Sequence, residues 1–85
     1  MIPLSLAELT RATSGRLAGI SHAAAERLVV DGPVVTDSRE CGPGGLYVAR
    51  VGEHADGHDF IPQALAAGAV AVMTTRVVEG VPSIV

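Results

Sequence analysis

Aromatic and cationic side chains are scarce in this sequence. Its 85 residues include one Phe, one Tyr and no Trp, none of its six basic residues is a lysine, and the formal net charge is -3. Nucleic-acid binding requires a basic surface for the phosphates and, for single strands, aromatic rings on which bases stack. We therefore expect no nucleic-acid partner.

Cysteine and long apolar runs are also scarce. Cys41 is the single cysteine, which excludes an internal disulfide and a cysteine-based zinc site and fits a reducing, cytoplasmic setting. Residues 1–5 lack the basic and apolar regions of a secretory signal. Charged residues interrupt every apolar stretch well short of the roughly 20 residues that span a membrane. We expect a cytoplasmic protein without a membrane partner.

Small aliphatic residues dominate what is present. Hydrophobic residues make up 48% of the chain, and its length suits one domain, residues 1–85, with a single modest core. In the N-terminal third, Ser5 and Glu8 form a capping-box pattern that predicts a helix, and Gly15 predicts its left-handed stop. Residues 16–19 suit a short strand, and residues 20–27 are expected to form a loop because they show neither a stop signal nor an apolar stripe.

The remaining two thirds alternate strand and helix patterns. Residues 28–30 and 34–35 suit either one bent strand or two strands around a turn. Residues 46–51 suit a strand, residues 59–67 a helix capped by Asp59, and residues 69–73 a buried strand, which together predict a βαβ unit. The fold class is thus α/β, with a mixed, partly parallel sheet. Residues 83–85 begin another strand, which we interpret as a domain taken from a longer chain.

Polar groups follow two of these strands. Residues 36–39 (Thr-Asp-Ser-Arg) come after Val34-Val35, and residues 52–57 must turn after the strand at 46–51. Ligands of open α/β sheets gather at the carboxyl ends of strands. The two turns would offer backbone amides, a hydroxyl, a guanidinium and a carboxylate to one small polar ligand.

Three other patterns favour structural interpretations. Residues 42–45 (Gly-Pro-Gly-Gly) lack the Lys-Ser/Thr of a phosphate-binding loop and suit a turn. Residues 54–59 hold two His and two Asp, but Gly57 interrupts the helical face that a metal site would need, so we expect no metal and a bridging role for His58. Cys41 has no identifiable His-Asp arrangement that would make it a nucleophile.

Four blocks of residues, in this order and spacing, resemble the N-terminal domain of the Mur ligases of peptidoglycan synthesis. They are Thr36–Arg39, Gly42–Ala49, Gly52–Phe60, and Ala64 with Ala67–Ala69. The resemblance implies a small sandwich of mixed sheet and helices that binds the uridine diphosphate (UDP) part of a sugar-nucleotide substrate. By this resemblance the ligand-binding residues are Thr36, Ser38, Glu53, His54 and Ala55. Arg39 matches the motif too, either as a ligand-binding residue or as the partner of Asp37 or Asp56.

Within the family, the early helix and the closing residues 80–85 resemble the ligases that add D-alanyl-D-alanine, and ligases that add the third peptide residue are the alternative. The resemblance implies a UDP-N-acetylmuramoyl-peptide as substrate, and ATP and Mg²⁺ as cofactors of the full-length ligase. It also implies central and C-terminal domains of the same chain as partners. These 85 residues hold no ATP site, so we expect them to bind substrate without catalysing a reaction.

A different class of function is a non-catalytic interaction module. A final strand left at the edge of a sheet would expose unpaired backbone groups, so we also consider self-association through strand pairing.

Overall fold

A computed structural model describes residues 3–85. The elements along the chain are β1 (Leu4–Ser5), α1 (Leu6–Ala12), β2 (Leu17–Ala18), α2 (His22–Arg27), β3 (Val29–Val30), β4 (Val34–Val35), the 3-10 helix η1 (Ser38–Glu40), β5 (Leu46–Val48), the 3-10 helix η2 (Gly57–Phe60), α3 (Ile61–Ala66), β6 (Ala71–Met73) and β7 (Ser83–Ile84).

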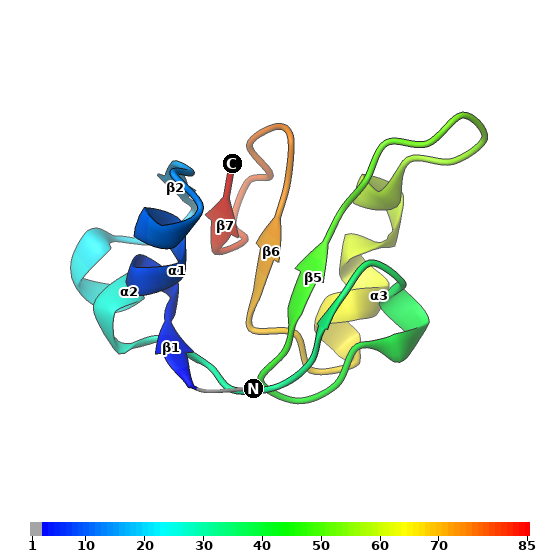
Figure 1. The fold of residues 1–85 in the computed structure, drawn as a ribbon. Coiled ribbons are helices and arrows are strands. Elements are labelled where there is room, and N and C mark those ends of the chain that lie inside the picture. The colour runs from blue at the N-terminus through cyan, green and yellow to red at the C-terminus, as the bar shows by residue number, and fades with distance from the viewer. Residues whose placement is uncertain (1–2) are drawn as a thin grey trace.

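The main sheet has five strands in the order β2-β7-β6-β5-β4 (Figure 1). β4, β5, β6 and β7 run parallel, and β2 pairs antiparallel with β7. A second, two-stranded antiparallel sheet joins β1 to β3. The α/β class with a mixed, partly parallel sheet is therefore confirmed, as is the βαβ unit formed by β5, α3 and β6.

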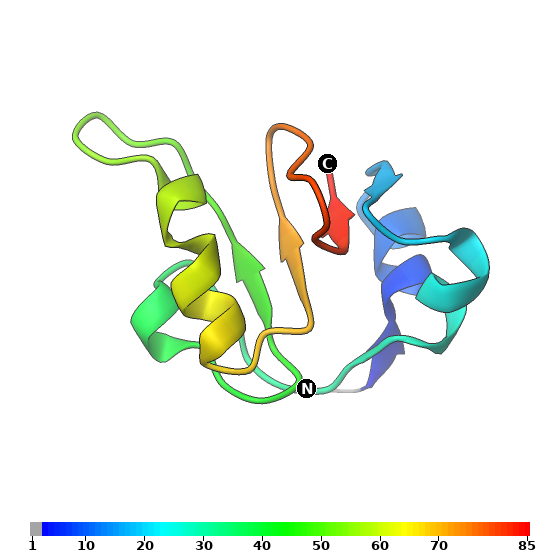
Figure 2. The same cartoon turned by 180° about the vertical axis from the view of Figure 1, so that it is seen from behind.

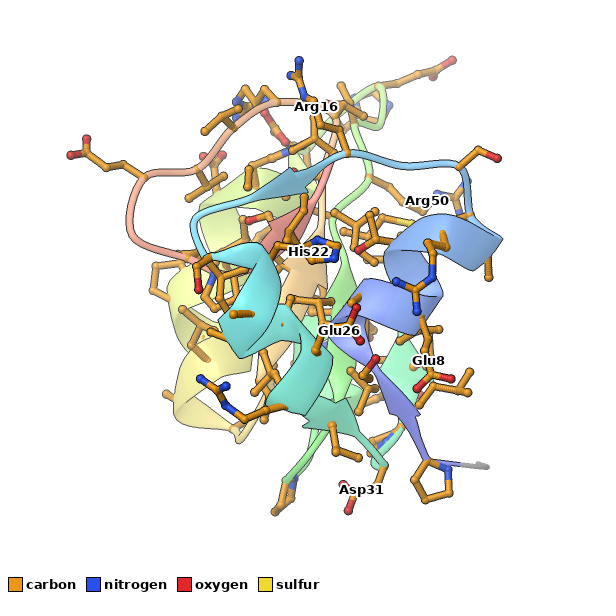
Figure 3. The ribbon with its side chains drawn as sticks, turned by 90° about the vertical axis from the view of Figure 1, so that its left-hand side faces the viewer. Glu8, Arg16, His22, Glu26, Asp31 and Arg50 are labelled. Atoms are coloured by element: carbon orange, nitrogen blue, oxygen red, sulfur yellow. The ribbon has the colours of Figure 1, made fainter. Side chains whose placement is uncertain are left out.

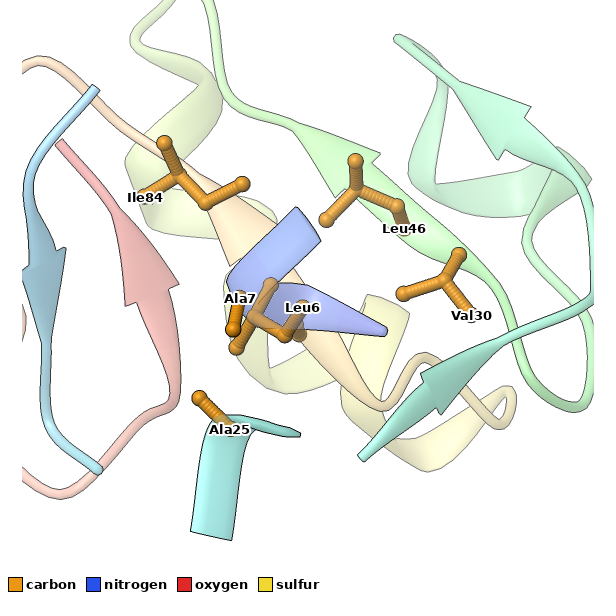
Figure 4. Close-up of a cluster of buried hydrophobic side chains, with 7 residues drawn as sticks. Leu6, Ala7, Ala25, Val30, Leu46 and Ile84 are labelled. Atoms are coloured by element: carbon orange, nitrogen blue, oxygen red, sulfur yellow. The ribbon is translucent and has the colours of Figure 1, made fainter. Parts of the chain in front are cut away.

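The main sheet carries a core on each face because neighbouring strand residues point to opposite sides. On one face, Leu46 of β5 and Ala71 of β6 pack with α1, α2 and β3 (Figure 4). On the other face, Tyr47 and Val72 pack against α3. Figure 2 shows α3 separated from α1 and α2 by the sheet. The chain thus has two small aliphatic cores, one on each face of the sheet, rather than the single core expected from its length.

The N-terminal helix begins where its capping box predicts. Ser5 Oγ accepts from the Glu8 amide at 3.0 Å, and Glu8 Oε1 accepts from the Ser5 amide at 3.0 Å. The predicted stop at Gly15 is wrong, because Ser14 takes the left-handed conformation with φ 56°. Gly15 is needed for a different reason, since a Cβ there would overlap the Ile84 side chain.

The loop predicted for residues 20–27 is wrong, because most of that segment is helix α2. Ser21 caps it, its Oγ accepting from the Ala24 amide at 3.1 Å. Only Ala25 is fully buried, against α1, so the helix lacks the apolar stripe that sequence patterns detect. On its outer face His22 and Glu26 lie one turn apart, with Nε2 and Oε1 3.3 Å from each other (Figure 3).

The segment after β5 also differs from expectation. β5 ends at Val48 rather than Val51, and residues 57–60 form the 3-10 helix η2 before α3 begins at Ile61. Asp59 is therefore not the helix cap. Asp56 takes that role one turn earlier, because its Oδ1 accepts from the His58 amide at 2.9 Å. Pro62 lies in the first turn of α3 as predicted, where a missing N–H costs nothing.

The last strand is not a sheet edge. β7 lies between β6 and β2, so the expectation that residues 83–85 expose an unpaired strand is wrong. The antiparallel pairing of Leu17 with Ile84 and Ala18 with Ser83 covers it. The two edges, β2 and β4, are each two residues long, which leaves little edge for strand pairing.

The glycine-rich segment 42–45 forms the turn that leads into β5. The Gly45 amide donates to the Gly42 carbonyl at 3.0 Å, and the Gly32 amide donates to the Gly44 carbonyl at 2.9 Å. Gly44 has φ 75°, a conformation that favours glycine. The turn therefore lies at the amino end of β5, at the end of the sheet opposite to the carboxyl ends of β4 and β5.

Candidate functional site

A cavity of about 590 Å³ lies beyond the carboxyl ends of β4 and β5. Two polar turns and the start of α3 line it, together with Tyr47 of β5. The lining residues are Thr36, Asp37, Ser38, Arg39, Tyr47, Arg50, Val51, Gly52, Ala55, Gly57, Phe60 and Gln63. The predicted convergence of the two turns at this edge is confirmed.

The first turn is stabilised by Asp37. Its Oδ1 accepts from the Arg39 amide at 2.9 Å and from Arg39 Nε at 3.0 Å, and its Oδ2 accepts from an Arg39 terminal nitrogen at 2.7 Å. The Arg39 side chain hydrogen bonds lower the pKa of Asp37 to about 2. Of the two partners considered for Arg39, the structure selects Asp37, and the Arg39 side chain remains 79% exposed at the cavity rim.

Ser38 is the buried member of this turn. It is 6% exposed, and its Oγ donates to Gln63 Oε1 of α3 at 3.1 Å. Gln63 was not among the residues predicted for the site. The available signal was a single amide in the first turn of an otherwise apolar helix, but the pattern does not show which strand end that helix faces.

The second turn places only one of its three predicted site residues in the cavity lining. The Gly52 amide donates to the Ala55 carbonyl at 2.8 Å, and Val51 forms a bridge with Asp56. Ala55 lines the cavity. The Glu53 and His54 side chains are 95% and 96% exposed at the tip of the turn, outside the cavity lining. Any contact of these two residues with a ligand in the cavity would require the tip to fold inward.

Asp56 and His58 connect this turn to the segment after β6. Asp56 Oδ1 lies 2.6 Å from His58 Nδ1, and His58 Nε2 accepts from the Thr75 amide at 3.2 Å. Because Nε2 accepts, the ring proton is on Nδ1 and is donated to Asp56. Asp56 Oδ2 also accepts from Arg76 at 2.9 Å. The predicted bridging role of His58 is confirmed, since the ring is buried and joins two loops.

Tyr47 and Arg50 complete the cavity wall. The buried Tyr47 hydroxyl donates to the Gly57 carbonyl at 2.8 Å, and burial raises the pKa of Tyr47. Arg50 is exposed and, within residues 3–85, has no carboxylate partner. Arg50 and Val51 also line a second hollow of about 410 Å³, between the ends of β5 and β6. The guanidinium is thus available to an anion at the border of the two hollows.

No metal centre is indicated by the part of the chain that the structure describes. Within residues 3–85, no group of three or more His, Cys, Asp or Glu side chains is placed to hold an ion. In the His54–Asp59 segment the buried ring and its neighbouring carboxylate bind each other, and His54 points to solvent. The same residues contain no helix of the length and apolarity that crossing a bilayer requires.

Acid is expected to weaken the two turns. The pKa values of Asp37 and Asp56 are lowered from 3.8 to about 2, the first chiefly by the Arg39 side chain and the second chiefly by the His58 amide. A carboxyl with a lower pKa in the folded state contributes stability above its unfolded pKa and loses it as pH falls toward its folded pKa. The free energy of unfolding should therefore decrease between about pH 4 and pH 2.

Urea unfolding at pH 2, 3, 4 and 7 measures this dependence. Asp37→Asn and Asp56→Asn should each flatten the curve below pH 4, whereas Asp59→Asn serves as the matched control. If all three variants keep the full acid dependence, the two paired carboxylates are not its source.

Comparison with known proteins gives matches over the whole chain. A family model described as Mur ligase family, catalytic domain, matches residues 33–81. The UDP-N-acetylmuramoyl-tripeptide--D-alanyl-D-alanine ligase of Mycobacterium leprae is 49% identical over 85 residues, which is 100% of this chain and 16% of that protein. The UDP-N-acetylmuramoyl-L-alanyl-D-glutamate--2,6-diaminopimelate ligase of Synechococcus elongatus is 42% identical over 72 residues, 85% of this chain and 14% of that protein.

Solved structures of Mur ligases also match this chain. A crystal structure of MurF from Acinetobacter baumannii superposes with a TM-score of 0.76 and 26% identity, covering 98% of this chain and 18% of that chain. The chain therefore spans about one sixth of the length of the relatives that it matches.

Proposed function

The chain belongs to the Mur ligase family, and we propose that it binds the UDP end of a UDP-N-acetylmuramoyl-peptide as the N-terminal domain of a ligase that adds D-alanyl-D-alanine to this peptidoglycan precursor. One observation carries the proposal. The Thr36–Arg39 turn and the Gly52–Gly57 turn, both within the family resemblance, line one cavity beyond the carboxyl ends of parallel strands, where α/β sheets bind ligands.

The cavity has the size and chemistry for a nucleoside diphosphate. Its volume of about 590 Å³ lies within the usual range of small-molecule sites, about 300–1,000 Å³. Phe60 and Val51 give it an apolar wall, and Ser38 and Gln63 give it a polar one. Arg50 attracts the diphosphate at the border with the second hollow, into which the rest of a sugar nucleotide would extend.

In this proposal the chain contributes binding energy at a distance from the reaction. Holding the UDP end positions the peptide carboxylate at the other end of the substrate, so that energy from a non-reacting part is used for orientation. Thr36, Ser38, Arg39 and Ala55 are the proposed contacts from the lining, and Glu53 and His54 the proposed contacts from the tip of the second turn.

ATP and Mg²⁺ are proposed for the full-length ligase but not for these residues. The sequence has no lysine for a phosphate-binding loop, and no cluster of metal-ligating side chains forms within residues 3–85. The residues described do not fit either cofactor, so no step of the reaction is assigned to them. Central and C-terminal domains of the same chain would supply the ATP site, in a cytoplasmic enzyme.

The ligases that add D-alanyl-D-alanine are favoured over those that add the third peptide residue. The Mycobacterium leprae relative matches all 85 residues, whereas the diaminopimelate ligase of Synechococcus elongatus matches 72 at lower identity. An interaction module that pairs through its last strand is not favoured, because β7 lies inside the sheet.

Ser38→Ala combined with Arg39→Ala should abolish UDP binding without unfolding the chain. The change removes the buried hydroxyl and the rim guanidinium, and each hydrogen bond to a charged or buried partner contributes about 1–3 kcal/mol. Isothermal titration with UDP and with the UDP-muramoyl peptide measures the loss, and circular dichroism confirms that the fold remains.

Arg27→Ala, an exposed arginine on α2, is the matched control and should bind UDP normally. Absence of binding heat at millimolar UDP with a folded, unsubstituted chain would overturn the proposed function.

A further inference from the structure

One aromatic ring of the cavity wall is open to a ligand. Phe60 lines the cavity and is 44% exposed, and it is not among the ligand contacts named above. We propose that the nucleobase of the ligand stacks on the Phe60 ring, which makes Phe60 the residue that selects a planar base. The inference rests on the proposed function, because it concerns how the base end of a nucleoside diphosphate is held.

The composition leaves few other rings for this role. The chain has one Phe, one Tyr and no Trp, and Phe60 and Tyr47 both line the cavity. Tyr47 is only 2% exposed, and its hydroxyl donates to the Gly57 carbonyl at 2.8 Å. Of the two rings, only that of Phe60 therefore has a surface on which a base can stack.

The histidine rings lie elsewhere. His58 is 7% exposed, and both of its ring nitrogens are hydrogen-bonded within the chain. His22 belongs to α2, which the sheet separates from α3 (Figure 2). His54 lies at the tip of the second turn, 96% exposed and outside the cavity lining. A base bound within the cavity therefore contacts Phe60 rather than a histidine.

The backbone at Phe60 is fixed by its neighbours. Phe60 is the last residue of η2 and directly precedes α3. On either side of it, His58 and Ile61 are buried, and the Ile61 amide donates to the His58 carbonyl. The segment that carries the ring is thus ordered before a ligand arrives, so binding does not have to order it.

Val51 adds a second exposed apolar side chain to the same cavity. It is 61% exposed, and the Gly57 amide donates to the Arg50 carbonyl at 2.7 Å, which joins the segment of Val51 to the start of η2. Covering apolar side chains with the flat face of a base removes apolar surface from water, which is favourable. This part of the wall therefore suits a base better than a phosphate.

The unpaired charge of the cavity sets the direction of the ligand. Arg50 has no carboxylate partner within residues 3–85 and borders the second hollow, so it attracts the diphosphate. The base then lies against Phe60 and the diphosphate toward Arg50. Stacking uses the face of the base, which every base has. The selection made by Phe60 therefore concerns the planarity of the base and not its hydrogen-bonding edge.

Isothermal titration of UDP and 5,6-dihydro-UDP against the unsubstituted chain and Phe60→Leu tests the inference. The dihydro compound keeps both carbonyls and N3–H, but its ring is puckered and stacks poorly. The unsubstituted chain should bind UDP about tenfold more tightly than dihydro-UDP, as expected for one stacked base. Phe60→Leu keeps an apolar side chain without the ring. It should weaken UDP binding about tenfold and bring the two affinities to within about threefold.

Proton NMR of bound UDP gives a readout that a merely structural role of Phe60 would not move. The ring current of a stacked Phe60 should shift uracil H5 and H6 upfield in the complex, and Phe60→Leu should remove this shift. Phe60→Tyr, which keeps the ring, should restore both the upfield shift and the preference for UDP. If His54→Ala removes the shift and Phe60→Leu keeps it, the base stacks at the tip of the second turn and the inference is wrong.

Val77→Ala is the control, because Val77 is 59% exposed and outside the cavity lining. It should bind both compounds as the unsubstituted chain does, and circular dichroism confirms that each variant is folded. If the unsubstituted chain binds UDP and dihydro-UDP equally, or if Phe60→Leu keeps the preference for UDP, the inference is wrong and the proposed function stands. If the folded chain binds neither compound, both the proposed function and the inference fail.

Discussion

Leu6→Ala should lower the free energy of unfolding by about 2–5 kcal/mol and the melting temperature by roughly 10–25 °C. Leu6 is fully buried at the start of α1, in the cluster that joins α1, α2 and β3 to the main sheet (Figure 4). Truncation removes apolar contacts and leaves a cavity among small neighbours such as Ala7, Ala25 and Ala71, whose side chains cannot extend to fill it.

Thermal and urea unfolding measure the effect. Leu9→Ala, one turn later on the same helix, is the matched control. Leu9 is only partly buried against the same cluster, so its truncation should cost about 1–2 kcal/mol. Equal decreases in the free energy of unfolding for the two variants would show that Leu6 contributes no more to the cluster than the partly buried Leu9.

His58→Ala should lower the free energy of unfolding by about 2–3 kcal/mol. The ring accepts from the Thr75 amide and donates to Asp56, and its side chain is 3% exposed. Its removal leaves the Thr75 amide without its acceptor and takes one donor from the Asp56 carboxylate, which keeps its hydrogen bonds from the His58 amide and Arg76. An unpaired buried donor together with the cavity left by a buried ring costs more than an average hydrogen bond. The second turn of the cavity would also lose its connection to the segment after β6.

His54→Ala, in the same motif, provides the comparison. Its side chain is 96% exposed, so the substitution should change stability by no more than about 0.5 kcal/mol. Chemical unfolding of both variants at pH 7 separates them. A loss at His58 no larger than that at His54 would mean that the bridge between the two loops contributes nothing to stability.

Local patterns predicted the elements whose signals lie within a few residues. The Ser5–Glu8 capping box marked the start of α1, and short continuous apolar runs marked β5 and β6. Caps and apolar runs involve only residues that are close together in the sequence. Helix α2 could not be predicted this way. Its burial consists of Ala25 against α1, and that contact exists only after α1 has packed.

The candidate site was likewise predictable in part: its location was, but the partners of its side chains were not. The convergence of the turns after β4 and β5 followed from the predicted α/β class, since ligands of open α/β sheets gather at the carboxyl ends of neighbouring strands. The hydrogen-bond partners of individual side chains could not be predicted from the sequence pattern. Arg39 pairs with Asp37 rather than Asp56, and Gln63 reaches Ser38 across 25 positions of sequence.

The amino-acid sequence by itself determined the α/β class, the aliphatic character of the core, the family resemblance and the two polar turns, because composition, caps and strand patterns act over short distances along the chain. The tertiary structure decided that β7 is an inner strand, that Glu53 and His54 point to solvent, and that Gln63 completes the cavity. These outcomes depend on which elements pack side by side, and the free energy of that packing depends on contacts between residues far apart in sequence.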